Sequence, residues 1–327
     1  MSATITRRDF GKAVALGSAA GSLPAWAAKT RDLKIGHTGI TWVNFAAPAP
    51  AAGSGPAGAP APQAPRRSGP PFDAAGIEET FRELGGLGFY GLELFSWQIQ
   101  GMEDHGGLAQ FIEKYNLPLI SAYGGPNLLD AAKRRDSIAE CVSWAKLLKK
   151  YGGKVVTIGP NGVPRASYHF HEHKADILAT LNEFGKALTD IGLTGCLHQH
   201  TGTCIESREE TYAIMEAVDT RYVKFGPDIG QLQKGGSDPV QVVKDFLPIV
   251  QHMHLKDYSG GEHWLGYCPL GQGKVNVPAV LDMMDGKKID GMVMVELDSS
   301  PGMPLSPAKS AAVAKAYLEK QGIKFRA

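Results

Sequence analysis

Two short stretches in the C-terminal half of the chain combine residue types that bind metal ions and transfer protons. Each stretch follows an apolar run typical of a β-strand, and side chains two positions apart on a strand lie on the same face. Histidines and a lysine with this spacing are therefore expected to share a face where strands end. These residues are His198, His200, His252, His254 and Lys256.

Carboxylates follow two further apolar runs. Asp228 comes after residues 222–225, and Glu296 closes the run 292–295. Burying Glu296 would be costly without a cation, whereas Asp228 alone is equally compatible with a turn or a helix N-cap. Two carboxylates with one or two imidazoles and water match one divalent metal ion of the Mn, Mg, Co or Zn group, used as a Lewis acid. Such an ion would favour removal of a proton next to the carbonyl of a sugar.

The elements that position these groups alternate along the chain. Eight strand-like runs alternate with eight helix-like runs, which predicts one α/β domain, a closed (β/α)8 TIM barrel, with a doubly wound open sheet as the alternative. In a TIM barrel, the active face lies at the C-terminal strand ends, where the polar groups above are expected. The strand-like runs are 33–37, 90–95, 117–122, 155–158, 193–199, 222–225, 249–255 and 292–297. The helix-like runs are 75–87, 106–115, 128–151, 173–191, 207–218, 239–246, 277–285 and 307–320.

Two segments lie outside this alternation. Residues 1–27 are interpreted as a twin-arginine signal peptide, because Arg7-Arg8 precedes a small-residue apolar stretch and Ala25-Trp26-Ala27 offers a cleavage site. A cytosolic helix that begins with two arginines is the alternative. The mature barrel, 28–327, is then expected to be periplasmic or otherwise exported, with no stable membrane anchor. Residues 46–71 are almost wholly Ala, Pro and Gly and predict a flexible insertion in the first β/α loop, either tolerated or acting as a lid.

The composition limits the class of partner. With 34 basic and 33 acidic residues, the formal net charge is +1, which provides no field for nucleic acid or an anionic membrane. We therefore expect a small-molecule partner, a sugar or cyclitol, and leave homo-oligomerisation open. The four cysteines lack CxxC spacing and are interpreted mainly as core residues, with one disulfide left open.

Longer motifs connect the chain to a known family. They cover residues 35–42, 91–94, 198–203, 228–231, 252–257, 269–273 and 295–296. The most specific are His-Met-His-Leu-Lys-Asp at 252–257 and Pro-Leu-Gly-Gln-Gly at 269–273. Through these motifs the chain resembles the sugar phosphate isomerase/epimerase family with the xylose-isomerase-like barrel, and within it is most similar to the inosose dehydratase branch.

The resemblance implies a set of metal ligands. Family members hold a divalent ion with a carboxylate from the fifth β/α unit, an aspartate from the sixth, a histidine from the seventh and a glutamate from the eighth. The last three correspond to Asp228, His254 and Glu296. For the fifth unit we assign Glu206. The alternative is His198 or His200, because His198 occupies the strand position often held by glutamate.

Further roles are assigned around this set. The catalytic candidates are Glu206, Glu296, His198, His200 and Lys256. The candidates for substrate binding are His37, Trp42, Glu93, Gln231 and His252. Of these, Gln231 occupies the histidine position of the family's Asp-x-Gly-His pattern.

The expected activity is metal-dependent isomerisation or epimerisation of a free sugar, ketosugar or cyclitol through proton abstraction next to a carbonyl. A dehydratase or lyase that eliminates water or an aglycone from a keto-sugar or 3-keto-glycoside is the alternative. Phosphorylated substrates are disfavoured because export is expected and no glycine-rich phosphate cradle with lysine is evident. An exported, non-catalytic carbohydrate-binding barrel is disfavoured because the three ligand positions are intact. A DNA-repair endonuclease would need more strand-end histidines and a basic groove.

Overall fold

The computed structural model describes residues 30–43, 45 and 72–327. The expected signal peptide at 1–27 and the expected insertion at 46–71 lie outside the described residues. Within the described residues, we find no helix that combines the length and the apolar character needed to cross a membrane.

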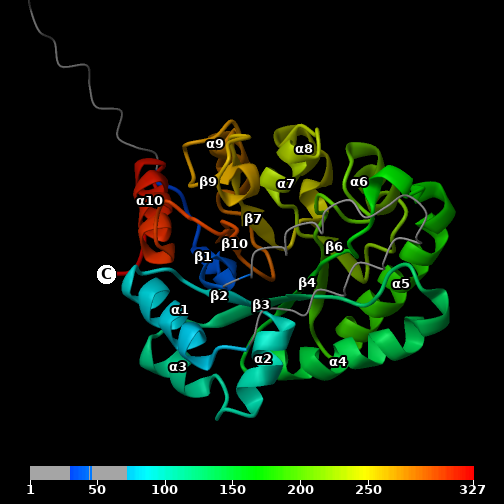
Figure 1. The fold of residues 1–327 in the computed structure, drawn as a ribbon, viewed down its shortest axis with the longest axis horizontal. Helices are drawn as coiled ribbons and strands as arrows, with labels where there is room; N and C mark the ends of the chain where they lie inside the picture. Colours follow the sequence, from blue (N-terminus) through cyan, green and yellow to red (C-terminus); the bar gives the residue numbers. More distant parts are fainter. Residues whose placement is uncertain (1–29, 44, 46–71) are drawn as a thin grey trace, which may run out of the picture.

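Eight parallel strands of the described chain form a barrel surrounded by helices (Figure 1). Their order is β6-β5-β4-β3-β2-β1-β10-β7, and parallel bridges from Phe225 to Val250 and from Asp228 to His254 connect the two ends of this series. The barrel is therefore closed, which confirms the predicted (β/α)8 architecture over an open sheet. The strands are β1 (Ile35–Thr38), β2 (Leu92–Phe95), β3 (Leu119–Gly124), β4 (Val155–Ile158), β5 (Thr194–Leu197), β6 (Val223–Phe225), β7 (Met253–Leu255) and β10 (Val293–Val295).

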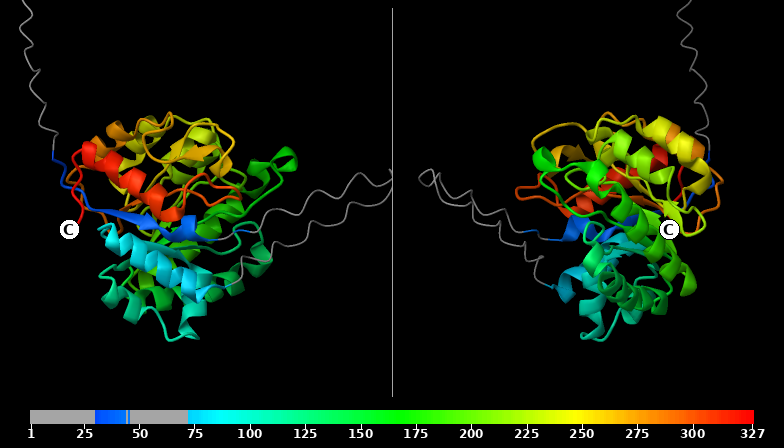
Figure 2. Two further views of the ribbon diagram at one scale, coloured as in Figure 1. Left: turned by 60° about the vertical axis from the view of Figure 1, so that its left-hand side comes forward. Right: turned by 90° about the vertical axis from the view of Figure 1, so that its right-hand side faces the viewer.

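The outer helices cover the barrel with apolar faces. In α1, for example, Ile77, Phe81 and Leu84 are buried at the three- and four-residue spacing of an amphipathic helix. The first and last helices, α1 and α10, pack side by side although they come from opposite ends of the described chain (Figure 2). The helices are α1 (Ala74–Gly86), α2 (Ser96–Glu103), α3 (Ala109–Lys114), α4 (Arg134–Lys150), α5 (Phe170–Asp190), α6 (Arg208–Met215), α7 (Ile229–Lys234), α8 (Pro239–Phe246), α9 (Val277–Met284) and α10 (Pro307–Lys320). All four cysteines of the sequence are buried and free of disulfides.

Two short helices were not expected from the sequence. The first, α2, begins directly after β2, where the side chain of Gln98 accepts a hydrogen bond from the backbone of Phe95 at 3.0 Å. The second, α7, begins at Asp228, whose Oδ1 accepts hydrogen bonds from the backbone nitrogens of Gly230 and Gln231 at 2.8 and 2.9 Å. Both helices are too short for a clear apolar periodicity, so their side-chain caps are the main sequence signal.

The two most specific sequence motifs meet at Asp257. This residue begins β8 (Asp257–Tyr258), which forms an antiparallel pair with β9 (Tyr267–Cys268). Its carboxylate accepts hydrogen bonds from the backbone nitrogens of Gly271, Gly273 and Val275 at 3.0, 2.9 and 3.1 Å. Gly271 has a φ of +83°, and a Cβ on Gly273 would collide with the Asp257 carboxylate. Asp257 and the glycines therefore shape the loop that follows β9.

Candidate metal centre and active site

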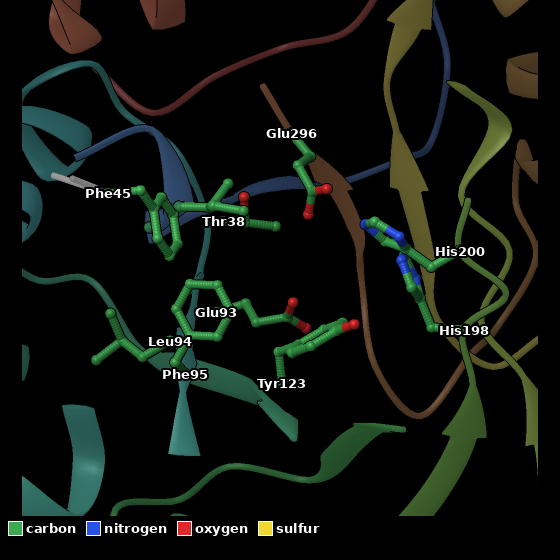
Figure 3. A pocket seen from close by; sticks show the side chains of 11 residues that line it. Thr38, Phe45, Glu93, Leu94, Phe95, Tyr123, His198, His200 and Glu296 are labelled. Atoms are coloured by element: carbon green, nitrogen blue, oxygen red, sulfur yellow. The ribbon is translucent and has the colours of Figure 1, made fainter. Parts of the chain in front are cut away.

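A cavity of about 190 Å³ lies at the C-terminal ends of the barrel strands. Its polar lining consists of Thr38, Glu93, Tyr123, His198, His200 and Glu296. Its apolar lining includes Ile40, Phe45, Leu94 and Phe95. Figure 3 shows the carboxylates of Glu93 and Glu296 on the side of the two strands β2 and β10, and the imidazoles of His198 and His200 facing them. This is the active face of a TIM barrel.

One group of potential metal ligands adjoins this cavity through His198, which lines it. His198, Asp228 and His254 are buried and offer ligand atoms that all lie within 4.8 Å of one another. The Nε2 of His198 lies 4.0 Å from Oδ2 of Asp228, and the Nδ1 of His254 lies 2.8 Å from Oε2 of Glu296. Two imidazoles and two carboxylates therefore converge from the ends of β5, β6, β7 and β10.

Several atoms of this group lack the hydrogen bonds that buried polar atoms normally make. Asp228 uses Oδ1 to cap α7, but its Oδ2 has no hydrogen-bond partner among the described residues. The same holds, within the described chain, for Nδ1 of His198. The ring nitrogens of His254 also lack aligned hydrogen bonds, but the carboxylates of Glu296 and Glu93 lie 2.8 and 3.0 Å from them, outweigh the effect of burial and raise the pKa of His254 well above its ordinary value. Since buried polar groups are nearly always satisfied, this donor set fits a divalent cation.

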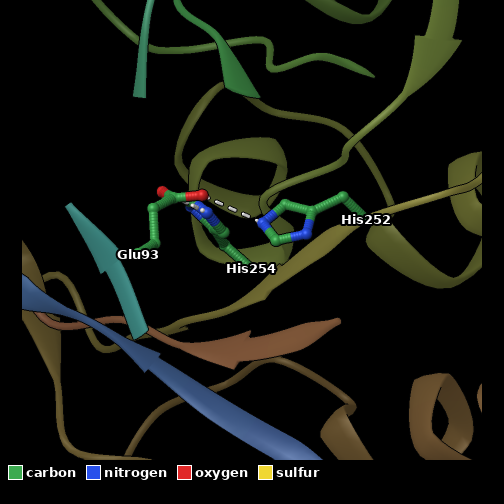
Figure 4. Close-up of side chains that lie close together, drawn as sticks. All are labelled: Glu93, His252 and His254. Carbon is green, nitrogen blue, oxygen red and sulfur yellow. Dashed lines mark hydrogen bonds and ion pairs between the residues drawn. The ribbon is translucent and has the colours of Figure 1, made fainter. Parts of the chain in front are cut away.

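In a second group, Glu93 contacts both His252 and His254 (Figure 4). The backbone nitrogen of Met292 donates to Nδ1 of His252, so the ring proton of His252 is on Nε2. That nitrogen donates to Oε2 of Glu93 at 3.0 Å, and the hydroxyls of Ser121 and Thr157 donate to the same oxygen at 2.6 Å. These bonds hold Glu93 and His252 in place, so only Oε1 of Glu93 remains to contact Nε2 of His254, at 3.0 Å.

Lys256 is fully buried among three carboxylates. Its Nζ lies 2.6 Å from Glu296, 2.8 Å from Asp298 and 3.6 Å from Asp228. Burial opposes the positive charge, but the three carboxylates outweigh it and raise the pKa of Lys256 well above its ordinary value. Lys256 is therefore an ammonium that balances the carboxylates and can donate hydrogen bonds, not a proton acceptor.

The environment separates the proton affinities of the other groups. Burial alone would raise the pKa of Glu296, but Lys256 and His254 hold it well below its ordinary value. Burial and the neighbouring His254 hold the pKa of His198 well below its ordinary value, whereas burial raises that of Tyr123. Near neutral pH the cavity thus combines a charged carboxylate, a neutral imidazole and a protonated phenol.

His200 and Gln231 are fixed as a pair. The side-chain oxygen of Gln231 accepts from the backbone and hydroxyl of Thr201 at 3.1 and 2.7 Å, so its amide nitrogen faces His200. That amide nitrogen lies 2.8 Å from Nε2 of His200, while Nδ1 of His200 donates to the carbonyl of Thr201 at 2.7 Å. Gln231 therefore selects the tautomer of His200.

The structure does not bring Glu206 to either group of ligands. Its carboxylate accepts a hydrogen bond from the backbone of Gly202 and lies 3.6 Å from Nε of Arg165. The fifth-strand side chain that lies with Asp228 and His254 is His198, the alternative that the sequence left open. The physical reason is local, because the loop before α6 turns Glu206 towards Arg165.

His37 and Trp42 support the end of β1 instead of lining the cavity within the described residues. Nδ1 of His37 donates to the carbonyl of Thr38 at 2.6 Å, and its ring packs edge-on against Trp42 and Phe89. The indole nitrogen of Trp42 donates to Glu83 on α1 at 2.6 Å. Burial lowers the pKa of His37 to about 4.

Three polar residues of the site were missed from the sequence: Tyr123, Asp298 and Thr38. Tyr123 follows Ser121 at a spacing of two on β3, and Asp298 follows Glu296 at the same spacing, so strand alternation could have found both. Thr38 ends β1 and lines the cavity, and its hydroxyl has no hydrogen-bond partner in the described part of the chain.

Comparisons with known proteins agree with this architecture. An inosose dehydratase from Clostridium botulinum (strain Alaska E43 / Type E3) is 23% identical over 271 residues, which cover 75% of this chain and 89% of that protein. Two solved structures, each 16% identical, cover 88% of this chain and 98% of their own. They are the IolI protein with a binding zinc atom, at a TM-score of 0.66, and the 3-keto-D-glucoside 4-epimerase YcjR from E. coli, at 0.60.

The profile of one family spans most of the chain. It matches residues 81–321, from within α1 to the end of α10, and so includes seven of the eight barrel strands. The chain therefore belongs to the xylose isomerase-like TIM barrel family.

Proposed function

We propose that this protein is a divalent-metal-dependent enzyme that removes a proton next to the carbonyl of a free sugar, ketosugar or cyclitol and returns it, as an isomerase or epimerase. The observation that carries the proposal is the convergence of His198, Asp228 and His254, with unused ligand atoms, beside the charged carboxylate of Glu296. Export, inferred from residues 1–27, favours a substrate without phosphate.

His198, Asp228, His254 and Glu296 would hold the ion, which belongs to the Mn, Mg, Co or Zn group. The zinc atom bound by the IolI protein supports a metal in this fold. When bound, a divalent ion supplies Lewis acidity that lowers the pKa of a C–H bond next to a carbonyl.

Glu296 is the candidate base. It lines the cavity, and the contacts with Lys256 and His254 keep it charged, so it can accept a proton from a substrate carbon. The ammonium of Lys256 also holds the carboxylate in one orientation, because its 2.6 Å contact is with Oε1 while His254 contacts Oε2. A base that is charged and fixed before substrate enters requires little rearrangement during proton transfer.

The opposite wall offers donors for substrate oxygens. The phenol of Tyr123 lines the cavity there, beside the ring of His198, with the two ring centroids 5.5 Å apart. The unpartnered hydroxyl of Thr38 provides a further contact for a substrate hydroxyl. Phe45 and Phe95 supply an apolar wall suited to the C–H face of a sugar ring.

Dehydration is the second candidate, and Tyr123 favours it. A phenol that burial keeps protonated can give its proton to a departing hydroxyl while Glu296 takes the proton from carbon. The inosose dehydratase relative supports the same reaction class.

Incubation of the metal-loaded protein with free sugars, ketosugars, cyclitols and keto-glycosides in deuterated water tests the proposal. We expect deuterium next to a carbonyl, and loss of this label in Glu296→Gln but not in the matched variant Glu206→Gln. Label without cleavage identifies an isomerase or epimerase, and release of water or an aglycone identifies a lyase. Saturable sugar binding without any exchange or cleavage would contradict both and indicate a binding protein.

A further inference from the structure

The carboxylate of Glu93 lies deep in the barrel and contacts the metal-centre histidine from behind. Its side chain is 1% exposed, and its Oε1 lies 3.0 Å from Nε2 of His254. The other nitrogen of that ring, Nδ1, lies 2.8 Å from Glu296. His254 is therefore held between two carboxylates, one of which belongs to the metal centre and one of which does not.

The orientation of Glu93 is fixed by three donors on its other oxygen. Ser121 and Thr157 donate to Oε2 at 2.6 Å, and His252 donates to it at 3.0 Å. The proton of His252 cannot move to the other ring nitrogen, because that nitrogen accepts from the backbone of Met292 at 3.2 Å. These bonds occupy Oε2 and leave Oε1 to contact His254.

We propose that Glu93 is a positioning residue for His254: its Oε1 holds the Nε2 edge of the imidazole, so that Nδ1 is presented to the metal centre beside Glu296 and Asp228. The inference rests on the proposed metal centre. It gives Glu93 a role other than the substrate contact expected from the sequence. A carboxylate behind a metal-binding histidine fixes the tautomer and the direction of the ring.

The variant Glu93→Gln tests this role because an amide has only one oxygen. The three donors require that oxygen at the place of Oε2, so the amide nitrogen faces Nε2 of His254. Nε2 must then accept a hydrogen bond, which leaves the ring proton on Nδ1, the nitrogen needed by the metal. We expect the dissociation constant for Co²⁺ to rise ~10- to 100-fold, with a changed visible spectrum of the bound Co²⁺.

Matched variants separate this effect from general damage. Glu103→Gln changes a carboxylate on α2 that accepts from Lys150 and Tyr151, and it should leave Co²⁺ affinity and spectrum unchanged. The double variant Ser121→Ala, Thr157→Val keeps Glu93 but removes two of its three anchoring donors, so a smaller loss of Co²⁺ affinity is expected. This variant decides the question if Glu93→Gln does not fold.

The proposal is overturned if folded Glu93→Gln binds Co²⁺ with unchanged affinity and spectrum. If Glu93→Gln does not fold, the same result in the double variant overturns it. A raised KM for sugar with unchanged Co²⁺ binding in Glu93→Gln would also overturn the proposal, because it would indicate that Glu93 contacts the substrate. Wild-type protein that binds Co²⁺ but exchanges no substrate proton would contradict the proposed reaction and leave this test valid. Wild-type protein that binds no Co²⁺, Zn²⁺ or Mn²⁺ would overturn both.

Discussion

Glu296 and Lys256 form an ion pair of 2.6 Å inside the barrel, where the lysine side chain is fully buried and that of the glutamate is 7% exposed. Removing one partner of a buried pair leaves an uncompensated charge and typically costs about 3–5 kcal/mol. Replacing Lys256 is therefore expected to change both the pKa of the candidate base, Glu296, and the free energy of unfolding.

Substitution of Lys256 should move the pH dependence of proton exchange. The charge of Lys256 lowers the pKa of Glu296, so Lys256→Met raises that pKa and shifts the acidic limb of the rate profile to higher pH. Lys256→Arg keeps a positive charge and should shift this limb less. Rates of solvent deuterium exchange across the pH range measure both variants. If the acidic limb lies at the same pH in Lys256→Met and in the wild type, Lys256 does not control the pKa of the base.

Metal content should distinguish the two fifth-unit ligand candidates. His198→Ala removes an imidazole that lies with Asp228 and His254, and we expect its Zn²⁺ affinity to fall by more than about a hundredfold. Glu206→Gln changes a carboxylate that lies beside Arg165 and should keep the metal. Elemental analysis after dialysis against a weak chelator provides the comparison. Loss of metal in Glu206→Gln with retention in His198→Ala would reverse the assignment.

The fold and the inward-facing groups of the site follow from local sequence patterns. Alternation through β7 places His254 on the same face as His252, the residue before the strand, and both contact Glu93. The path of a loop has no such periodicity, which is why the sequence alone led to Glu206 as the fifth-unit ligand, with His198 or His200 as the alternative. The role of Gln231 in orienting His200 could not be predicted either, because it depends on a hydrogen bond from Thr201, which lies on a different loop.

His37 should make the metal-free protein less stable in mild acid. The unfolded chain takes up a proton near pH 6.5, whereas burial delays protonation of the folded protein to about pH 4. The free energy of unfolding therefore falls as the pH drops through this window, by about 3 kcal/mol for this residue. His37→Asn keeps a donor for the carbonyl of Thr38 but does not titrate. Urea unfolding at both ends of the window should show a smaller fall for the variant, and equal falls would refute the assignment.

Asp257 should stabilise the loop after β9 without a role in metal binding. In Asp257→Asn one carboxylate oxygen becomes a donor that faces backbone N–H groups of Gly271 and Gly273. An unsatisfied buried group costs about 1–3 kcal/mol, so we expect a loss of that size in the free energy of unfolding and unchanged metal content. Asp219→Asn, at an exposed pair with Arg221, is the matched control and should change stability little. Wild-type stability in Asp257→Asn would show that these bonds are dispensable.

The most direct test of metal-dependent proton transfer compares deuterium incorporation by chelator-treated protein with that by the same preparation reloaded with Mn²⁺, Co²⁺ or Zn²⁺. We expect a ketosugar or keto-cyclitol to acquire deuterium next to its carbonyl only after reloading with at least one of these ions. Incorporation at the same rate without metal would contradict the proposed metal-dependent proton transfer. So would the absence of incorporation or elimination across the substrate panel in protein that holds one ion per chain.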